Sequence, residues 1–288
     1  MKNKKIKIFC ITHKPLVEIS NLGLIPFGVG KNEYPKNFLT ETSGKNISSK
    51  NPYYGETTFH YWFWKNKLRE DIEEGEWFGM CQYRRYFVKI ENRNKILNSN
   101  GHQGFMKDLN NINQLKNILQ LEANEQWKEY DVILCDPWSV EVEKFSKLFK
   151  KAKLELIKDP FLFFKKKKHN IRLHFNMYHG KFFLDKAISF LPQEDQESFL
   201  QYLTINTKLK GHCIFYSNKK KLVEKFYQNL FNWLFKCEKY FGISNLNGYG
   251  QQRIYSFLTE RYMPYWFEKN SKVLTWPWVY YDISKNNY

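Results

Sequence analysis

The residues best suited to chemistry in this chain follow short apolar runs. These runs have the length and composition of buried strands, and in an open α/β sheet ligands bind beyond the carboxyl ends of the strands. Guanidinium forks bind phosphate oxygens in pairs, and glycine lets backbone N–H groups approach a ligand. We therefore expect a site for a phosphorylated ligand at the residues that follow these runs: Thr12, His13, Lys14, Gly28, Gly30, Lys31, Gln82, Tyr83, Arg84, Arg85 and Asp136.

Two adjacent arginines make the stretch CQYRRYF, residues 81–87, the most informative of these. Successive side chains of a strand point to opposite faces of the sheet. If the strand continues through Arg84 and Arg85, only one of them can face the ligand. The other would then pair with an acid such as Glu56 or Glu76.

Several familiar site motifs are missing. The glycines of GVG, residues 28–30, are not followed by the rest of a dinucleotide-binding or phosphate-loop motif. The five cysteines are widely separated and form no CxxC pair, so neither a zinc site nor a disulfide framework is indicated. Asp136 is a single carboxylate, and a histidine near a strand end, such as His13, is more often an ordinary loop histidine than a functional one. The sequence therefore indicates an anion site and no metal centre.

Hydrophobic periodicity predicts an α/β fold that positions these residues. Strands are expected at residues 6–12, 24–30, 76–83, 130–137 and 211–216. One long helix should begin at Asn51, with Pro52 in its first turn, and end near Gly75. Further helices are expected at 141–158, 171–190, 194–206, 219–240 and from Gly250 onward. Residues 1–137 thus resemble an α/β nucleotide-binding half, and 138–288 a mostly helical half completing the same domain.

The charge of the chain is strongly positive and unevenly spread. Lys plus Arg number 46 against 29 acids, a net charge of +17, which favours a polyanionic partner such as nucleic acid, an anionic membrane face or a phosphorylated substrate. Between Lys144 and Lys181, twelve Lys or Arg stand against two acids. The interleaved apolar residues suit an amphipathic helix interrupted by Pro160, which is typical of a lipid-surface element. A solvated lysine-rich face explains the pattern equally well.

The location expected from the sequence is cytoplasmic. No apolar run reaches the ~18 residues needed to span a bilayer, and residues 1–14 lack the apolar core of a signal peptide. Cysteines that close apolar runs fit buried free thiols in a reducing compartment. Peripheral attachment to the inner face of the cytoplasmic membrane is compatible with the basic segment.

Longer phrases carry a resemblance to a known family. In order along the chain they are KIFCITHKP (7–15), VGK (29–31), NISSKNPYYGETTFHYWFWKN (46–66), FGMCQYRRYF (78–87), YQNLFNWLFKCEK (227–239) and GQQRIYSFLTERYMPYW (250–266). They resemble a family of bacterial capsular and exopolysaccharide glycosyltransferases that was first catalogued as a domain of unknown function. The chain departs from the family pattern at Gln82, where a histidine is usual, and at His212, where an asparagine is expected.

The resemblance implies a GT-A-like sheet that binds a nucleotide sugar, with a largely helical C-terminal half. The donor would be a nucleoside-diphosphate sugar carrying galactofuranose or another hexose, and the acceptor a capsular or surface polysaccharide or its lipid-linked precursor. No further cofactor is implied. Carried over position by position, the resemblance adds these substrate-binding residues to those named above: Asn46, Asn51, Lys65, Asn66, Gln251 and Arg253.

The chemistry of such a transfer requires charge stabilisation, because the departing nucleoside diphosphate becomes more negative. GT-A enzymes commonly use a divalent ion held by an Asp-x-Asp motif, which this sequence lacks. We hypothesise that Arg84 and Arg85, helped by Lys14 or Lys65, bind the diphosphate in place of the metal. A divalent ion is compatible with the sequence but is not indicated by it.

An inverting transfer also needs a general base for the acceptor hydroxyl. The candidates are Glu56, Asp136 and Glu260, with Glu56 ranked first because it lies in the densest motif. At a helix N-terminus Glu56 could instead bind backbone amides or Arg84, and Glu260 could form a structural ion pair with Arg253. Two other function classes stay open, a nucleic-acid-binding protein and a basic scaffold on a membrane surface without catalysis.

Overall fold

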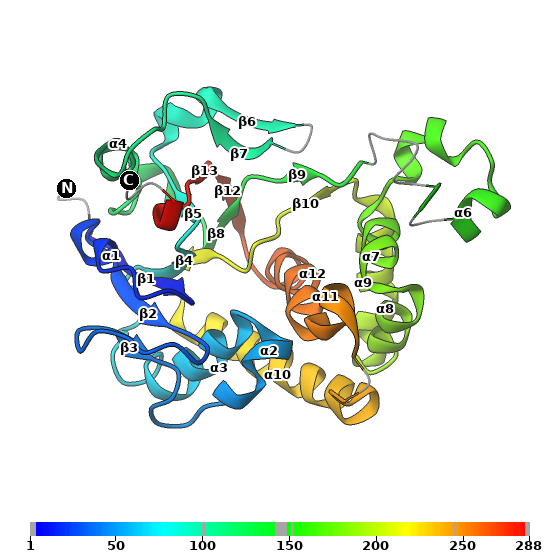
Figure 1. Ribbon diagram of the computed structural model, residues 1–288, viewed down its shortest axis with the longest axis horizontal. Helices are drawn as coiled ribbons and strands as arrows, with labels where there is room; N and C mark the ends of the chain where they lie inside the picture. Colours follow the sequence, from blue (N-terminus) through cyan, green and yellow to red (C-terminus); the bar gives the residue numbers. More distant parts are fainter. Residues whose placement is uncertain (1–3, 100–101, 142–148, 151–152, 245, 286–288) are drawn as a thin grey trace.

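A mixed sheet forms the centre of the computed structural model, which describes residues 4–99, 102–141, 149–150, 153–244 and 246–285 (Figure 1). Over these residues the sheet has nine strands, seven of them in the order β12-β8-β11-β4-β1-β2-β3, with β5 paired to β4 and β13 to β5. The strands are β1 (Lys7–Thr12), β2 (Ile25–Gly28), β3 (Leu39–Thr40), β4 (Phe78–Gln82), β5 (Arg85–Phe87), β8 (Val132–Cys135), β11 (Phe215–Ser217), β12 (Val273–Trp276) and β13 (Trp278–Tyr280).

The direction of the strands brings distant polar residues to one edge. β1 pairs in parallel with β2 and β4, β2 with β3, and β8 with β12. β11 alone in the row runs antiparallel to both of its neighbours, β4 and β8. The carboxyl ends of β1, β2, β4, β8 and β12 therefore share an edge, and the chain enters β11 at that same edge.

All five predicted strands are present, each somewhat shorter than predicted or shifted, and the last differs most. The expected strand at 211–216 is occupied by β11 only from Phe215. His212 and Cys213 precede it with φ values of 81° and 52°, a left-handed conformation that few residues other than glycine and asparagine adopt readily. Asparagine adopts this conformation more readily than most residues, and the turn keeps the chain out of the sheet until Phe215.

The single long helix predicted from Asn51 to Gly75 is wrong. The segment forms α2 (Asn51–Tyr54) and α3 (Thr57–Asn66), separated at Gly55, where φ is 52° and ψ is −136°. Such a conformation is open to glycine and costly for other residues. The break turns the chain between two helices whose apolar periodicity is continuous, so the pattern of apolar residues alone does not reveal it.

The later helices agree with the prediction in position, with two interruptions. The region 171–190 is divided at Gly180 into α7 (Ile171–His179) and α8 (Lys181–Ile188). The region from Gly250 is divided near Arg253 into α11 (Gly248–Gln252) and α12 (Ile254–Asn270). α9 (Gln193–Ile205) and α10 (Lys220–Phe241) are continuous. Of the expected helix at 141–158, residues 142–148 and 151–152 lie outside the described residues, and α6 covers Lys153–Lys158.

The remaining elements are short and peripheral. They are α1 (Glu18–Asn21), the paired strands β6 (Ile96–Ser99) and β7 (His102–Met106), α4 (Ile112–Ile118), and the paired strands β9 (Trp138–Ser139) and β10 (Lys208–Leu209). No helix among the described residues is both long and apolar enough to cross a membrane.

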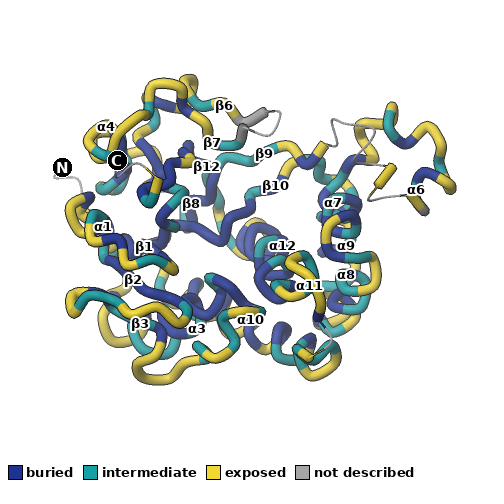
Figure 2. Tube along the Cα trace, viewed as in Figure 1, coloured by how far each residue is buried: buried dark blue, intermediate teal, exposed yellow. Residues whose placement is uncertain are grey.

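Aromatic side chains fill the core on both faces of the sheet. In Figure 2 the strands β1, β2 and β8 are drawn mostly as buried. α3, α10 and α12 cover one face with rings such as Phe63, Tyr227 and Trp266. Trp127 and Trp276 fill the other face. Tyr54, Phe59 and Trp62 of α2 and α3 are buried in this core. All five cysteines are buried free thiols. The packed sheet gives its carboxyl edge a rigid base.

Candidate active site

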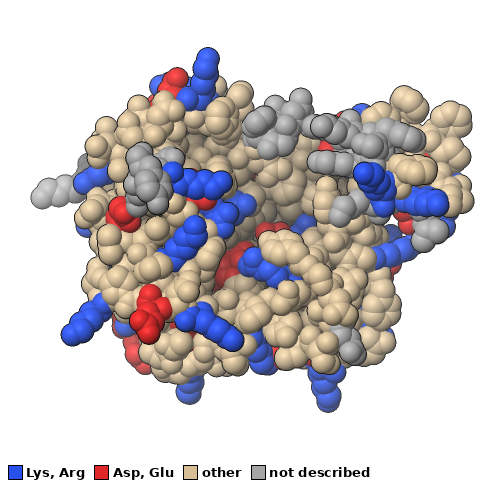
Figure 3. All heavy atoms as spheres, in the orientation of Figure 1, with Lys and Arg blue, Asp and Glu red and all other residues tan. Residues whose placement is uncertain are grey.

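A cavity of about 490 Å³ lies at the carboxyl edge of the sheet. On the face of the molecule seen in Figure 3, Lys and Arg side chains border a hollow near the centre that also contains acidic side chains. The cavity is closed on one side by β1 and the β4–β5 turn and on the other by α2, α11 and α12. Its lining includes ten of the residues predicted from the sequence: Thr12, His13, Asn51, Glu56, Gln82, Tyr83, Arg84, Arg85, Arg253 and Glu260.

The stretch CQYRRYF forms a tight hairpin, so the strand does not continue through Arg84 and Arg85. β4 ends at Gln82, Tyr83 and Arg84 make the turn, and β5 begins at Arg85, which pairs with Gln82. Because the chain reverses here, the two arginines no longer alternate across one strand, and both line the cavity. Neither contacts Glu56 or Glu76: Glu56 pairs with Arg253 and Glu76 with Lys7.

Each arginine of the hairpin is held by a different neighbour. The Arg84 guanidinium lies 4.5 Å from the centre of the Tyr83 ring, and its Nε is 4.0 Å from Oδ2 of Asp282. Arg85 donates from Nη1 to Oε1 of Gln82 at 2.7 Å. The Nε of Arg85 is buried without a hydrogen-bond partner among the described residues. Arg84 and Arg85 thus bring two guanidinium groups to the cavity, and of the two only Arg84 forms an ion pair among the described residues.

Gln82 connects three parts of the site. Its Nε2 donates to the backbone carbonyl of His212 at 2.7 Å and lies 3.5 Å from Oε1 of Glu56, while its Oε1 accepts from Arg85. An amide donates and accepts at the same time, as a neutral imidazole does. Gln82 can therefore make the hydrogen bonds of a neutral histidine at this position, but it cannot act as an acid or a base.

Gly55 allows Arg253 to reach the first turn of α3. Arg253 Nη2 donates to Glu56 Oε2 at 3.0 Å. The same guanidinium lies so close to Gly55 that a Cβ at that position would overlap it. Gly55 thus serves two purposes. It adopts a backbone conformation that is costly for other residues, and it leaves space for the Arg253 guanidinium from the C-terminal half. Asn51 supports the turn by donating from Nδ2 to the Gly55 carbonyl at 3.1 Å.

Glu260 is the second carboxylate of the cavity, and the predicted Glu260–Arg253 pair does not form. Glu260 Oε2 accepts from Nη1 of Arg261 at 2.6 Å. Arg261 is almost fully buried and also donates to the Phe257 carbonyl at 3.2 Å. Burial raises the pKa of Glu260, the Arg261 cation opposes this, and the Glu56 charge adds to the increase. The carboxyl group of Glu260 is therefore a weaker acid than a free glutamate.

His13 lies beside the cations of the site. Its ring packs edge-on to the Tyr83 ring, with centres 4.9 Å apart, and its Nε2 is 3.3 Å from the Tyr83 hydroxyl. Burial lowers the pKa of His13, and the charges of Arg84, Lys14 and Arg253 lower it further. We therefore expect His13 to be neutral in the free protein at neutral pH, able to donate or accept a hydrogen bond.

Asp136, Lys14 and Gln251 are not among the residues that line the cavity. Both oxygens of Asp136 accept from Arg93 at 2.9 Å. Lys14 Nζ donates to the Ser284 hydroxyl at 2.8 Å. These contacts give Asp136 and Lys14 a part in fixing loops next to the site. Gln251 lies on α11, which contributes Tyr249 to the lining.

Six further predicted residues also lie outside the cavity lining: Gly28, Gly30, Lys31, Asn46, Lys65 and Asn66. The two asparagines build the loop before α2. Asn46 accepts from the Ser48 amide at 3.1 Å, and Asn66 bonds the Lys45 amide and carbonyl at 2.9 and 2.8 Å. Lys65 Nζ lies 3.2 Å from the centre of the Trp64 ring. Motif residues of this region thus shape the backbone that presents Asn51 and Glu56.

The structure adds lining residues that the sequence did not single out: Tyr249, Ser256 and Phe257. Asp282 was also missed, although it is buried and approaches Arg84 from the C-terminal segment. Tyr249 is largely exposed at the mouth, and its hydroxyl accepts from Arg253 at 3.3 Å. Its spacing of four residues from Arg253 on a predicted helix was the available signal.

Glu41 is a buried carboxyl group next to the site. One of its oxygens accepts from the Gly30 amide at 2.8 Å. Burial raises the pKa of Glu41 from 4.5 to about 7, despite the neighbouring polar groups of Thr58, Gly30 and Asn51, which lower it. A carboxyl with a raised folded-state pKa stabilises the fold fully below its unfolded pKa, and this contribution is lost as the pH rises through the folded value.

We expect Glu41→Gln to abolish the loss of folding stability that the Glu41 carboxyl causes as the pH rises. The amide keeps an oxygen that accepts from the Gly30 N–H, and it cannot ionise. The free energy of unfolding of the variant, relative to the parent protein, should increase by about 3 kcal/mol between about pH 5 and about pH 8. Thermal or urea unfolding across that range measures it, with the exposed Glu33→Gln as a control. Parallel pH curves for parent and Glu41→Gln would contradict the expectation.

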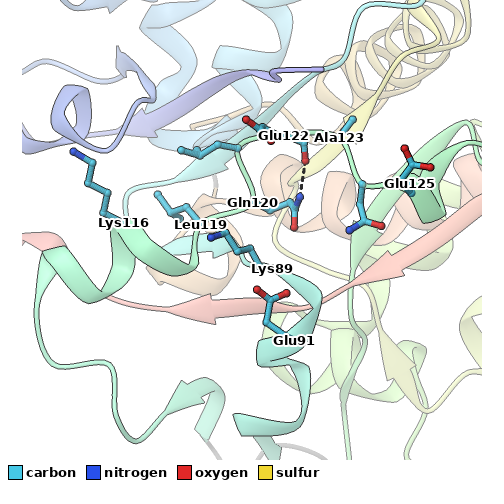
Figure 4. A pocket seen from close by; sticks show the side chains of 10 residues that line it. Lys89, Glu91, Lys116, Leu119, Gln120, Glu122, Ala123 and Glu125 are labelled. Carbon is cyan, nitrogen blue, oxygen red and sulfur yellow. Dashed lines mark hydrogen bonds between the residues drawn. The ribbon is translucent and has the colours of Figure 1, made fainter. Parts of the chain in front are cut away.

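A second hollow of about 410 Å³ lies away from the predicted residues. Figure 4 shows its side chains, among them Lys89, Glu91, Lys116 and Glu125. Its polar groups are partly used by the chain itself: Lys89 Nζ donates to the Asn117 carbonyl at 2.8 Å, and Gln120 Nε2 to the Glu122 carbonyl at 2.5 Å. Lysines and glutamates are mixed in this hollow, so it has no single charge preference.

Metal ligands are not gathered at either hollow. Across the ranges that the structure describes, no group of three or more His, Cys, Asp or Glu side chains is arranged to hold a metal ion. The cavity at the sheet edge does hold two carboxylates, Glu56 and Glu260, but each has an arginine partner.

Comparisons with known proteins agree with this geometry. No curated protein matches the chain. Among solved structures, the apo form of the bifunctional glycosyltransferase WbbM is similar, with a TM-score of 0.67 and 21% identity over 96% of this chain and 45% of that one. The chain thus spans less than half of that protein, and the likeness confirms the predicted GT-A-like α/β fold. Residues 7–271 match a family described as a domain of unknown function, DUF4422, and because this match covers most of the chain, the protein belongs to the DUF4422 family.

Proposed function

We propose that the protein transfers a hexose, with galactofuranose as one candidate, from a nucleoside-diphosphate sugar to a capsular or other surface polysaccharide. The observation that carries the proposal is the gathering of Arg84, Arg85 and Arg253 with Glu56 and Glu260 in one cavity at the carboxyl edge of the sheet. The fold shared with a glycosyltransferase supports it. Three cations suit a diphosphate, and two carboxylates supply proton acceptors.

The three arginines are proposed to hold the diphosphate of the donor. Arg84 and Arg85 come from the hairpin, and Arg253 comes from the junction of α11 and α12, so the cations reach the cavity from two sides. Fixed cations facing the departing phosphate stabilise its increasing charge without reorganisation. Lys14 and Lys65, which the sequence suggested as helpers, have partners elsewhere, and we leave them out of this role.

We propose Glu260 as the general base in preference to Glu56. Glu56 is bound to Arg253, and it keeps that cation in place for the diphosphate. Glu260 is bound to Arg261, which is buried and fixed by a backbone carbonyl. Because burial raises the pKa of Glu260, its carboxylate binds a proton more tightly than an ordinary glutamate does, which suits a base near neutral pH.

A thermal-shift panel with UDP, GDP, CMP and dTDP sugars tests the proposed function. A ligand at a hundred times its Kd stabilises the fold by about 2.7 kcal/mol, which should raise the Tm of a chain of this length by roughly 4–5 °C. We expect one nucleotide class to give this increase, equally in EDTA and in Mg²⁺ or Mn²⁺. Arg84→Ala should lose most of it, because Arg84 lines the cavity.

The matched control is Arg69→Ala, because Arg69 is an exposed arginine that pairs with Glu224 outside the cavity. It should respond to the nucleotide sugar as the parent protein does. A shift that EDTA abolishes would overturn metal independence. Silence of the parent protein across the whole panel would overturn the transferase proposal and favour the scaffold or nucleic-acid-binding alternatives.

A further inference from the structure

A surface distant from the cavity combines exposed apolar side chains with lysines. We call Ile157, Phe161, Phe164, Lys158 and Lys167 the aromatic-basic patch. The three apolar residues are 66%, 67% and 74% exposed. The patch is carried by α6 and by two short 3₁₀ helices, Leu162–Phe164 and Lys166–Lys168. In Figure 1 the α6 region projects at the right-hand end of the molecule.

The exposed apolar side chains are not a displaced part of the core. The same segment buries a different set, Leu156 and Leu162, which pack with Leu173 and Met177 of α7. His169 Nε2 is hydrogen-bonded to the Leu162 carbonyl at 3.0 Å, which fixes the returning chain. The segment therefore has its own small core, and Ile157, Phe161 and Phe164 remain outside it.

The charge around the patch is positive and only partly neutralised. Residues 153–181 contain eight Lys or Arg and two acids, Glu155 and Asp159. Asp159 is shared by Lys165 at 2.8 Å and Lys168 at 2.7 Å, and Glu155 faces Lys181 at 3.3 Å. Among the residues with described positions, Lys158 and Lys167 have no acidic partner. These two lysines therefore leave unbalanced positive charge beside the exposed rings.

We propose that the aromatic-basic patch binds the surface of an anionic lipid bilayer. Apolar side chains surrounded by lysines suit the bilayer interface, where the rings enter the acyl boundary and the ammonium groups stay among the headgroups. Binding of this kind increases with the buried apolar area and with attraction to anionic lipids. The proposal concerns the location of the protein and does not depend on the transferase reaction.

Nucleic acid is the weaker alternative for this surface. Aromatic residues that bind single strands offer ring faces on which bases stack. Ile157 offers no ring, and Phe163 and Phe164 meet edge to face at 82°. Ile157, Phe161 and Phe164 are each exposed over about two thirds of their surface or more. Apolar side chains this exposed gain most free energy when they leave water altogether. These features favour insertion into lipid over stacking on bases.

The proposal is tested by sedimentation of the full-length protein with lipid vesicles. Vesicles of phosphatidylcholine alone are compared with vesicles of equal parts phosphatidylcholine and phosphatidylglycerol. We expect binding to the anionic vesicles that weakens with salt. The double variant Phe161→Ser/Phe164→Ser should lose on the order of tenfold or more in partition, and Lys158→Gln/Lys167→Gln roughly thirtyfold.

The control variant is Val17→Ser/Lys36→Gln, which removes one exposed apolar side chain and one exposed lysine elsewhere on the surface. It should bind vesicles like the parent protein, and all variants should keep the parent melting temperature because the changed side chains are exposed. Equal partition of patch and control variants would overturn the proposal. So would absence of vesicle binding together with patch-dependent binding of a single-stranded oligonucleotide, which would assign the surface to nucleic acid instead.

Discussion

Gly55→Ala is expected to abolish most donor binding. The substitution places a methyl group where the Arg253 guanidinium lies and strains a backbone with φ of 52°. Arg253 must then leave Glu56 and the cavity. Loss of a hydrogen bond to a charged group costs roughly 1.5–3 kcal/mol, so the affinity for the nucleoside diphosphate should fall by roughly tenfold to over a hundredfold. Isothermal calorimetry with the diphosphate identified by the thermal-shift panel measures it.

Gly75→Ala separates this steric effect from backbone strain. Gly75 also has a positive φ, 87°, but an added Cβ at this position would meet nothing within 4 Å. Both substitutions should lower the free energy of unfolding by about 1–3 kcal/mol. Only Gly55→Ala should lower donor affinity. If the two variants bind the diphosphate equally well, Gly55 is needed for the fold alone and the proposed position of Arg253 is wrong.

Glu260→Gln is expected to reduce turnover by about two to four orders of magnitude while donor binding is retained. The amide keeps an oxygen that can accept a hydrogen bond from Arg261, which preserves the contact seen at 2.6 Å. It cannot take up the proton of the sugar hydroxyl that attacks the donor. Steady-state rates of sugar transfer, with donor affinity measured separately, distinguish the two effects. Glu56→Gln is the matched comparison and should weaken donor binding instead, because Glu56 holds Arg253.

The pH dependence of turnover provides a second check on Glu260. A base must be deprotonated, so the rate of the parent enzyme should rise with pH through the pKa of Glu260, which burial raises above the ordinary glutamate value. In Glu260→Gln this rise should disappear from the residual rate. If the rise persists in Glu260→Gln and vanishes in Glu56→Gln, the two carboxylates have exchanged roles.

Much of the sheet could be predicted because its strands are short apolar runs that end in polar residues. Residues 6–12, 24–30 and 130–137 all contain strands of the structure. The rule that ligands bind at carboxyl strand ends then found Thr12, His13, Gln82, Tyr83, Arg84 and Arg85 in the cavity lining. Asp136 follows a strand as well, but Arg93 binds it. A strand-end position therefore does not by itself show which groups remain available to a ligand.

Other parts of the site depend on contacts that periodicity does not encode. The Glu56–Arg253 pair joins residues that are 197 positions apart, and only the packed α12 brings them together. The hairpin at Tyr83 and Arg84 interrupts a run without proline or glycine, so turn chemistry gave no warning. Strands β12 and β13 were missed because their tryptophan-rich sequence resembles an exposed aromatic segment until the sheet covers it.

The reversed strand β11 has a consequence for how this protein is made. β11 begins at Phe215 and separates β4 from β8, whose residues are synthesised much earlier. Until that segment leaves the ribosome, β4 and β8 each have an unpaired apolar edge, the kind of edge that associates with other chains. Pairing across so many intervening residues is also slow, because the chain entropy of closing the loop must be overcome first. We therefore expect the carboxyl edge of the sheet to form late in synthesis and in one cooperative step, with chaperone binding as protection until then.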